Sequence, residues 1–428
     1  MKKLIFLLLC FASIVAKAQS GDAKGAWTGK LNVYGTELTL VFHLDSVNCT
    51  LDSPDQGAKG IPAKLEHTAT GIKVTVSAIN AIYEGVNMGK SIMGTFKQNG
   101  QSFPLTLTPG TVKRNRPQTP VGPYPYQTQE VSFSNGSAVL KGTLVLPENH
   151  TQNTPVLLMV TGSGLQNRDE EIFEHKPFAV IADALARQGI ATLRYDDRGF
   201  GGSTGDLVNV TTEDLKNDAL AGVELLRKQF KRVGILGHSE GGTIGLMLAA
   251  EGKVDFVVSL AGGVVSFEKT LLDQNRWTLQ QAGYSQDVTD RYCTALESLF
   301  DELKAGGNPE PTNHGLPAEL EQNLQIAKAQ SSTPYMRYFL GLDLTDRLSR
   351  ITCPVLALNG TKDRQVNGEE NLNALRNGLA GQKEIRVIEG VNHLFQHCNI
   401  GNPSEYKDIE ETFAPEALEI IVTWMKKR

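Results

Sequence analysis

The sequence predicts an α/β protein with a mostly parallel sheet flanked by helices, preceded by a small all-β domain. From residue 127 to 428, short apolar runs alternate with amphipathic helical stretches, a pattern typical of a parallel sheet covered on both faces. From 19 to 108, apolar and polar residues alternate between frequent glycines, as in a small antiparallel sandwich or barrel. The prolines of 109–126 indicate a semi-rigid linker between the two domains.

The elements of the larger domain follow from its apolar pattern. Two runs around Asn135 and Gly136 predict a β-hairpin. Apolar runs predict buried strands over 156–161, 190–195, 233–236, 256–260, 355–358 and 385–388. Amphipathic runs predict helices over 178–188, 213–230, 243–250, 369–379 and 415–427. The stretch 266–349 is too long for a simple crossover and has a helical pattern, so we expect a helical cap over the carboxyl edge of the sheet.

The first eighteen residues have the pattern of a secretory signal peptide. Lys2 and Lys3 form a basic flank, and the apolar run from Leu4 to Ala16 is too short to span a bilayer. Small residues then end the segment at Ala18. We therefore expect cleavage after Ala18 and export to the periplasm or the medium. No later stretch approaches the roughly 20 apolar residues that a membrane span needs.

The charge balance argues against a nucleic-acid partner. The chain has 42 Lys and Arg against 47 Asp and Glu, and loss of three lysines with the signal peptide changes the net charge from −5 to 39 − 47 = −8. Nucleic-acid binding needs clustered basic side chains. The cysteines at 49, 293, 353 and 398 have no metal-ligand spacing, and their disulfide state stays open. We therefore expect a small-molecule partner and no metal or other cofactor, with the oligomeric state undetermined.

Two segments match the G-x-S-x-G pattern of a serine nucleophile turn. Segment 237–241 directly follows an apolar strand and precedes a helix of small residues, which is the context of a nucleophile elbow. Segment 201–205 follows a polar loop and has neither neighbour. Ser239 is therefore the predicted nucleophile, and Ser203 the serine of an ordinary turn.

A serine hydroxyl needs a base to accept its proton. His393 lies just past the last predicted strand, where the chain order serine, acid, histidine places the base. His397 competes with it, and its spacing from His393 would suit a metal pair, but no third ligand lies nearby. We predict His393 as the base and His397 as a surface residue. His238 adjoins the nucleophile and is predicted to serve packing.

The acid that orients the base should follow a strand between serine and histidine. Asp363 lies just past the strand at 355–358 and shortly before a predicted helix. Asp343 and Asp346 belong to the last part of the cap and are poorer alternatives. Asp363 is therefore the predicted acid.

Negative charge that develops on a substrate carbonyl needs preorganised donors, an oxyanion hole. One donor would be the backbone N–H of Glu240, the residue after the nucleophile, and the other that of Ser163, in the glycine-rich loop after the first parallel strand. This loop lacks the Gly-Lys-Ser/Thr of a phosphate-binding loop. Arg168, Asp169 and Glu170 could contact the substrate, but a surface salt-bridge cluster is the simpler interpretation.

With these motifs, residues 126–428 resemble an α/β-hydrolase. Segment 237–241 is similar to the nucleophile elbow, 359–363 to the acid loop and 390–393 to the histidine loop of that fold. More narrowly, the chain is similar to bacterial esterases and serine-aminopeptidase-like hydrolases that carry an N-terminal β domain. Segment 162–170 looks like the oxyanion loop of that group, with Thr161 where many relatives have His.

These observations predict a carboxylic-ester hydrolase that works through an acyl-enzyme on Ser239. Short acyl chains are expected because the cap should restrict the pocket. The alternative is a serine exopeptidase, which would need an acidic group for the free amine of its substrate; the cap offers Glu297, Asp301 and Glu302. The N-terminal domain could bind carbohydrate through Trp27, although a structural role is the simpler prediction.

Overall fold

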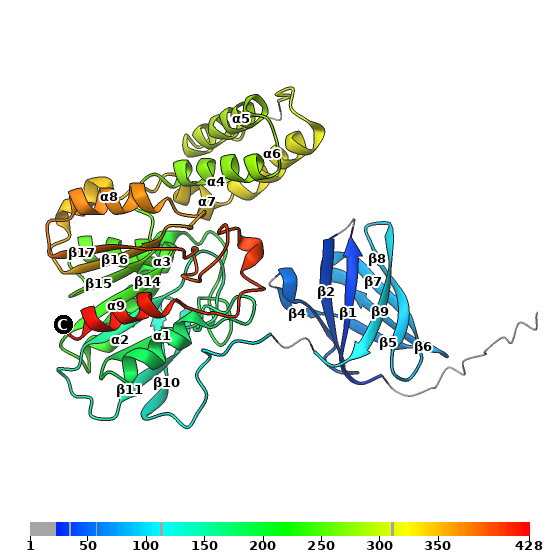
Figure 1. Cartoon of the computed structure of the whole chain (residues 1–428), viewed down its shortest axis with the longest axis horizontal. Coiled ribbons are helices and arrows are strands. Elements are labelled where there is room, and N and C mark those ends of the chain that lie inside the picture. Colours follow the sequence, from blue (N-terminus) through cyan, green and yellow to red (C-terminus); the bar gives the residue numbers. More distant parts are fainter. Residues whose placement is uncertain (1–22, 34–35, 57, 112–113, 310–311) are drawn as a thin grey trace, which may run out of the picture. The chain divides into compact units, whose positions relative to one another are not determined.

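The computed structural model describes residues 23–33, 36–56, 58–111, 114–309 and 312–428. The expected signal peptide and its cleavage site after Ala18 lie outside these residues. The chain divides into two compact units, with the division between Asn115 and Arg116. The N-terminal β unit and the C-terminal α/β unit, whose ribbons are drawn in Figure 1, each have a hydrophobic core of their own.

The β unit is an antiparallel sheet that closes on itself. Its strand order is β4-β3-β2-β1-β9-β8-β7-β6-β5. Because β4 and β5 are consecutive and separated only by Ala63, the two ends of the sheet are joined by the chain. The strands are β1 (Gly25–Val33), β2 (Thr36–Leu44), β3 (Thr50–Ser53), β4 (Ala58–Pro62), β5 (Lys64–His67), β6 (Gly71–Val76), β7 (Ala81–Asn87), β8 (Ile92–Gln98) and β9 (Gln101–Pro109), with short 3-10 turns at Pro54–Gln56 and Ser77–Ile79.

Alternate residues of these strands point inward and fill the closed sheet. Phe42 and Tyr83 are fully buried with ring centroids 5.3 Å apart, and the Tyr83 hydroxyl donates to the Ile92 carbonyl at 2.9 Å. Trp27 belongs to the same core and is only 6% exposed. It therefore offers no aromatic platform of the kind that carbohydrate binding would need, which favours the structural role for this unit.

The α/β unit is built on an eight-stranded sheet of order β10-β11-β13-β12-β14-β15-β16-β17. The first two strands form the predicted antiparallel hairpin, and the neighbours from β13 onward pair in parallel. All carboxyl ends of the parallel strands therefore meet at one edge. The strands are β10 (Tyr126–Asn135), β11 (Ala138–Pro147), β12 (Val156–Val160), β13 (Ala191–Tyr195), β14 (Val233–His238), β15 (Val257–Leu260), β16 (Val355–Gly360) and β17 (Lys383–Ile388).

Helices cover both faces of this sheet, as its fully apolar strands require. Helices α1 (Pro177–Ala186) and α9 (Pro415–Met425) pack on one face, in a core that includes Phe178 and Trp424. The other face carries helices α2 (Thr212–Arg227), α3 (Glu240–Ala250) and α8 (Gly368–Gly378). The predicted fold class, an α/β domain preceded by an all-β domain, is thus confirmed.

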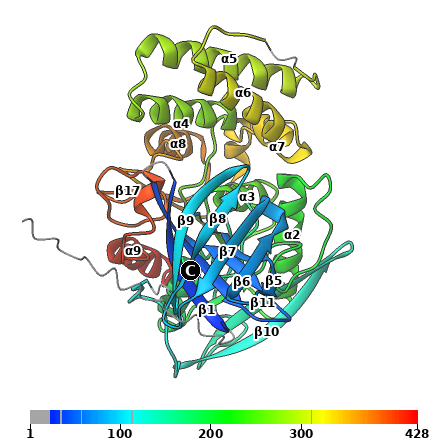
Figure 2. The ribbon, with the colours of Figure 1, turned by 90° about the vertical axis from the view of Figure 1, so that its right-hand side faces the viewer.

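The insert between β15 and β16 is helical. It comprises α4 (Phe267–Gln281), α5 (Gln286–Lys304), α6 (Ala318–Ser331), α7 (Pro334–Leu340) and the 3-10 helix η3 (Thr345–Arg350). These helices gather at one end of the α/β unit, with α5 farthest from the sheet (Figures 1 and 2). Leu296 and Phe300 of α5 anchor a separate small core. Helix α7 reaches back to the α/β core through two tyrosines, Tyr335 and Tyr338.

Half of the proline-rich stretch is fastened to the α/β unit. The Arg116 guanidinium donates to the carbonyls of Phe173, Lys407 and Ile409 at 2.7 to 3.1 Å. The Gln118 side chain exchanges hydrogen bonds with the backbone of Phe413. From Arg116 onward the chain therefore belongs to the α/β unit rather than to a free spacer.

The cysteines of the described residues are all free thiols, with Cys49 and Cys293 buried. In the same part of the chain, no helix is long and apolar enough to cross a membrane.

Candidate active site

Ser239 lies in a strained turn between β14 and α3. Its backbone has φ 53° and ψ −121°, a left-handed conformation that costs a non-glycine residue roughly 1 kcal/mol or more. The turn is possible because glycines flank it. A Cβ at position 237 would lie 2.0 Å from the Gly241 carbonyl oxygen, and a Cβ at position 241 would lie 2.0 Å from that of Val160. This geometry is a nucleophile elbow.

Asp363 and His393 form a buried pair at the same edge of the sheet. His393 Nδ1 lies 2.8 Å from Asp363 Oδ2, and the two residues are 3% and 8% exposed. The other oxygen, Asp363 Oδ1, accepts the backbone N–H groups of Gln365 and Val366 at 2.8 and 2.9 Å. One carboxylate oxygen is thereby bonded to the loop backbone, and the other faces the imidazole of His393.

The structure keeps the competing residues away from this pair. His397 is at the surface, with its ring nitrogens each 2.9 Å from a carboxylate, of Glu411 and of Glu416. Ser203 is a buried turn serine whose hydroxyl donates to the Asp196 carbonyl at 2.7 Å. Asp343 and Asp346 are exposed at the end of the cap.

The loop after β12 carries the predicted second donor. A Cβ added at Gly162 would lie 3.1 Å from Ser239 Cβ, so this loop runs directly against the serine. The Gly162 N–H is already used, because it donates to Glu170 Oε1 at 2.8 Å. Within the described residues, the backbone N–H groups of Ser163 and Glu240 donate to no protein acceptor. They are free to bind a substrate oxygen.

Glu170 and His238 belong to the site, which the sequence did not reveal. Glu170 is 3% exposed, so its assignment to a surface cluster was wrong. His238 Nδ1 lies 2.9 Å from Glu170 Oε1, and His238 Nε2 lies 2.9 Å from the His393 carbonyl oxygen. Burial alone would lower the pKa of His238, but the Glu170 carboxylate and the His393 carbonyl outweigh it and raise that pKa. The pair therefore links the oxyanion loop to the histidine loop.

The other two residues of the predicted cluster, Arg168 and Asp169, do form ion pairs. The Arg168 guanidinium bonds Asp196 and Glu130, and Asp169 bonds Arg194. These contacts hold the oxyanion loop against the sheet. Nothing in the sequence distinguishes Glu170 from them, because its partners, the Gly162 N–H and His238, come together with it only in the fold.

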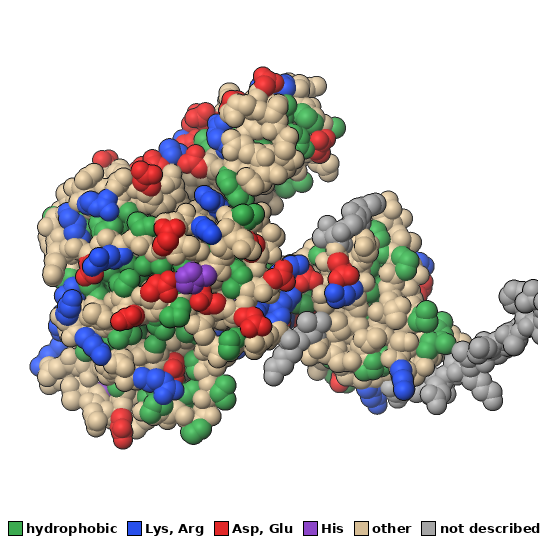
Figure 3. All heavy atoms as spheres, viewed as in Figure 1, with side chains coloured by type: hydrophobic (Ala, Val, Ile, Leu, Met, Phe, Trp, Pro, Cys, Tyr) green, Lys and Arg blue, Asp and Glu red, His purple; other side chains and the backbone are tan. Residues whose placement is uncertain are grey.

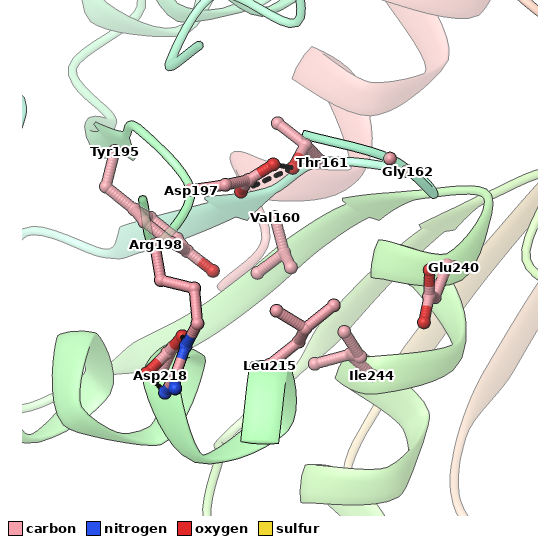
Figure 4. A pocket seen from close by; sticks show the side chains of 11 residues that line it. Val160, Thr161, Gly162, Tyr195, Asp197, Arg198, Leu215, Asp218, Glu240 and Ile244 are labelled. Carbon is pink, nitrogen blue, oxygen red and sulfur yellow. Dashed lines mark hydrogen bonds and ion pairs between the residues drawn. The ribbon is translucent and has the colours of Figure 1, made fainter. Parts of the chain in front are cut away.

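A small pocket beside the predicted oxyanion loop is lined by three buried carboxyl groups, of Glu240, Asp197 and Asp218, and the last of these is paired with Arg198 (Figure 4). At one end lies Glu240, and at the other Asp197, whose oxygens accept from Thr161 Oγ1 at 2.9 and 3.1 Å. Burial, reinforced by the charges of Glu170 and Glu240, raises the pKa of Asp197 to about 8. Asp197 is therefore mostly a neutral acid at pH 7.

Asp197→Asn should reduce the dependence of folding stability on pH. The pKa of Asp197 is about 8 in the folded protein against an ordinary 3.8, so the folded state holds an extra proton between these values and the free energy of unfolding falls as pH rises. An amide can keep both hydrogen-bond partners without a charge. Between pH 5 and pH 8, the free energy of unfolding measured in urea should fall by more than about 1 kcal/mol further for the wild type than for the variant. Equal losses would contradict the neutral acid.

The cap carboxylates considered for an exopeptidase do not approach the site. Glu297, Asp301 and Glu302 are exposed on α5, the cap helix farthest from the sheet (Figure 2). Asp301 pairs with Lys304 at 3.0 Å. Their role is that of solvated surface charges.

The strand order of the sheet, the serine elbow after β14 and the Asp–His pair after β16 and β17 define an α/β-hydrolase. Residues 135–399, more than half of the chain, match the X-Pro dipeptidyl-peptidase (S15) family, and the chain belongs to this family.

Individual relatives are more distant. Esterase EstD from Thermotoga maritima is 28% identical over 282 residues, 64% of this chain, and the chain spans 61% of the length of EstD. Among solved structures, Est1E from Butyrivibrio proteoclasticus is 15% identical with a TM-score of 0.40, over 70% of this chain and 96% of its own. The Pyrococcus furiosus esterase Pf2001 is 14% identical with a TM-score of 0.43, over 71% and 93%.

Proposed function

We propose that the protein hydrolyses carboxylic esters through an acyl-enzyme on Ser239. The observation that carries this proposal is the buried Asp363–His393 pair at the same sheet edge as the Ser239 elbow. The free N–H groups of Ser163 and Glu240 supply the oxyanion hole. Membership of a hydrolase family and the relation to EstD, which is named an esterase, support the same chemistry.

The steps follow from which nitrogen of His393 is free. Because Nδ1 faces Asp363, Nε2 takes the proton of the Ser239 hydroxyl as its oxygen attacks the ester carbonyl carbon. The protonated imidazole then gives this proton to the departing alcohol as the ester C–O bond breaks. Water attacks the resulting acyl-enzyme with His393 again as base, which releases the carboxylic acid and restores Ser239.

The substrate is proposed to be a small ester with a short acyl chain, since Tyr335 of the cap bonds Glu240 and so brings the cap close to Ser239. Lys and Arg are interspersed with Asp and Glu on the face shown in Figure 3, as suits a small-molecule rather than a nucleic-acid partner. Export is part of the proposal and is supported by the pattern of the first eighteen residues.

A serine exopeptidase is the second candidate, and the family description favours it. Such an enzyme must bind the free amine of a peptide. The cap carboxylates do not serve this purpose, and the buried carboxyls near the serine are bonded to protein groups. Ester hydrolysis is therefore the better supported reaction.

One experiment separates the two. Hydrolysis of p-nitrophenyl esters from acetyl to decanoyl should be measured beside X-Pro and single-residue aminoacyl anilides. We expect turnover of acetyl and butyryl esters, labelling of the protein by a fluorophosphonate, and loss of both in Ser239→Ala. The Ser203→Ala variant should keep both. Preferred cleavage of the anilides would replace the esterase by the peptidase, and ester turnover that survives Ser239→Ala would remove the proposed nucleophile.

A further inference from the structure

We propose that Tyr335 of the cap positions both oxyanion-hole donors, acting through the side chains of Ser163 and Glu240. Tyr335 is thus a positioning residue, which does not touch the substrate. The inference rests on the proposed function, because it concerns the hole that stabilises charge on the ester carbonyl.

Glu240 is fixed from two directions. The Tyr335 hydroxyl donates to Glu240 Oε2 at 2.5 Å, and Thr212 Oγ1 donates to Glu240 Oε1 at 2.6 Å. Glu240 is 2% exposed and Thr212 is fully buried. Glu240 is also the first residue of α3, directly after Ser239, so its side chain holds the helix start whose N–H points to the developing charge.

Ser163 lies next to the same group. Its side chain lies close enough to those of Glu240 and Tyr335 to lower the pKa of each. Ser163 is exposed and stands between two glycines, of which Gly164 has a φ of 95°, so its side chain can restrain a backbone position that is otherwise permissive. The Tyr335 hydroxyl thus bonds the side chain of one proposed donor residue, Glu240, and lies near the side chain of the other, Ser163.

The electrostatics suit this arrangement. Surroundings that favour the neutral form of a carboxyl next to the hole lessen its repulsion of negative charge on the substrate oxygen. Burial raises the pKa of Glu240, and the hydroxyls of Thr212, Tyr335 and Ser163 offset this only in part. Burial and the neighbouring Glu240 likewise hold the pKa of Tyr335 well above its ordinary value, so its hydroxyl remains a donor.

The cap holds Tyr335 rigidly enough for this role. Its ring stacks on Phe339 at a centroid distance of 5.8 Å, and Phe339 packs on Phe267 at 4.3 Å. Tyr338, on the same helix, offers a matched control. Its hydroxyl bonds Glu213 of α2 at 3.1 Å, and Glu213 is not one of the proposed oxyanion donors. Both tyrosines therefore connect α7 to the α/β core, but of the two only Tyr335 bonds a proposed donor residue, Glu240.

The test compares Tyr335→Phe with Tyr338→Phe on p-nitrophenyl butyrate, in the full chain. Loss of an oxyanion donor costs about 10²-fold to 10³-fold in kcat, and a misplaced donor somewhat less, so Tyr335→Phe should lower kcat at least about tenfold with KM within about twofold. Tyr338→Phe should leave both within about twofold. Thermal unfolding must show similar stability for the two variants. Equal kcat values for the two, or a Tyr335→Phe defect confined to KM, would overturn the proposal.

A double-mutant cycle with Ser163→Ala gives a second test. If Tyr335 and Ser163 act as one unit, the double variant should lose much less kcat than the product of the two single losses, whereas independent effects would multiply and contradict the proposal. Ser239→Ala separates failure of the proposed function from failure of the positioning role. Activity that survives Ser239→Ala would rule out the esterase mechanism. If Ser239→Ala abolishes activity but Tyr335→Phe leaves kcat unchanged, only the positioning role is ruled out.

Discussion

Replacing Asp363 with Asn should lower kcat for ester hydrolysis by about 10⁴-fold, the size of effect expected when the triad imidazole is held in the wrong tautomer. Asp363 Oδ1 accepts two backbone N–H groups, from Gln365 and Val366. The amide oxygen of an Asn would keep those bonds, and its NH₂ group would then face His393 Nδ1. That nitrogen would have to accept, so the ring proton would move to Nε2 and the imidazole could not take a proton from Ser239.

The measurement is kcat on p-nitrophenyl acetate at pH 7.5, with circular dichroism to verify folding. Asp346→Asn is the matched control, because Asp346 is an exposed acid that the sequence offered as an alternative to Asp363. It should keep full activity. An Asp363→Asn variant with more than about a tenth of wild-type kcat would mean that Asp363 does not orient the base.

The placement of the three main residues of the candidate site could be predicted from the sequence because each follows a strand of one parallel sheet. Ser239, Asp363 and His393 come after β14, β16 and β17, and parallel register brings those strand ends to a single edge. The glycines at 237 and 241 already indicate the turn in the sequence. The structure shows why they are required, since no Cβ fits at either position.

The supporting residues could not be predicted, because their contacts depend on loops and on the packing of the cap. His238 meets Glu170 across 68 residues, and Tyr335 meets Glu240 across 95. No period or motif encodes such a pairing. Glu170 also resembles in sequence the charged residues beside it, and its burial against Gly162 and His238 is visible only in the fold.

Replacing Gly241 with Ala should destabilise the α/β unit by about 3 kcal/mol or more and remove most of the activity. A Cβ at this position would lie 2.0 Å from the Val160 carbonyl oxygen and 2.6 Å from that of Thr161. Both are backbone atoms, which cannot rotate away as a side chain would. Either β12 and its oxyanion loop move, or α3 and the Ser239 elbow do, so stability and kcat should fall together.

Urea unfolding and kcat on the same preparation test this prediction, with Gly341→Ala as control. Gly341 has φ −83°, and an added Cβ would meet its nearest neighbour at an ordinary 3.6 Å. The control should stay within about 0.5 kcal/mol of wild type, as surface substitutions usually do. If Gly241→Ala changed the free energy of unfolding as little as the control does, the elbow would not lie as close to β12 as described. If it lost stability but kept full kcat, the oxyanion loop would not depend on that approach.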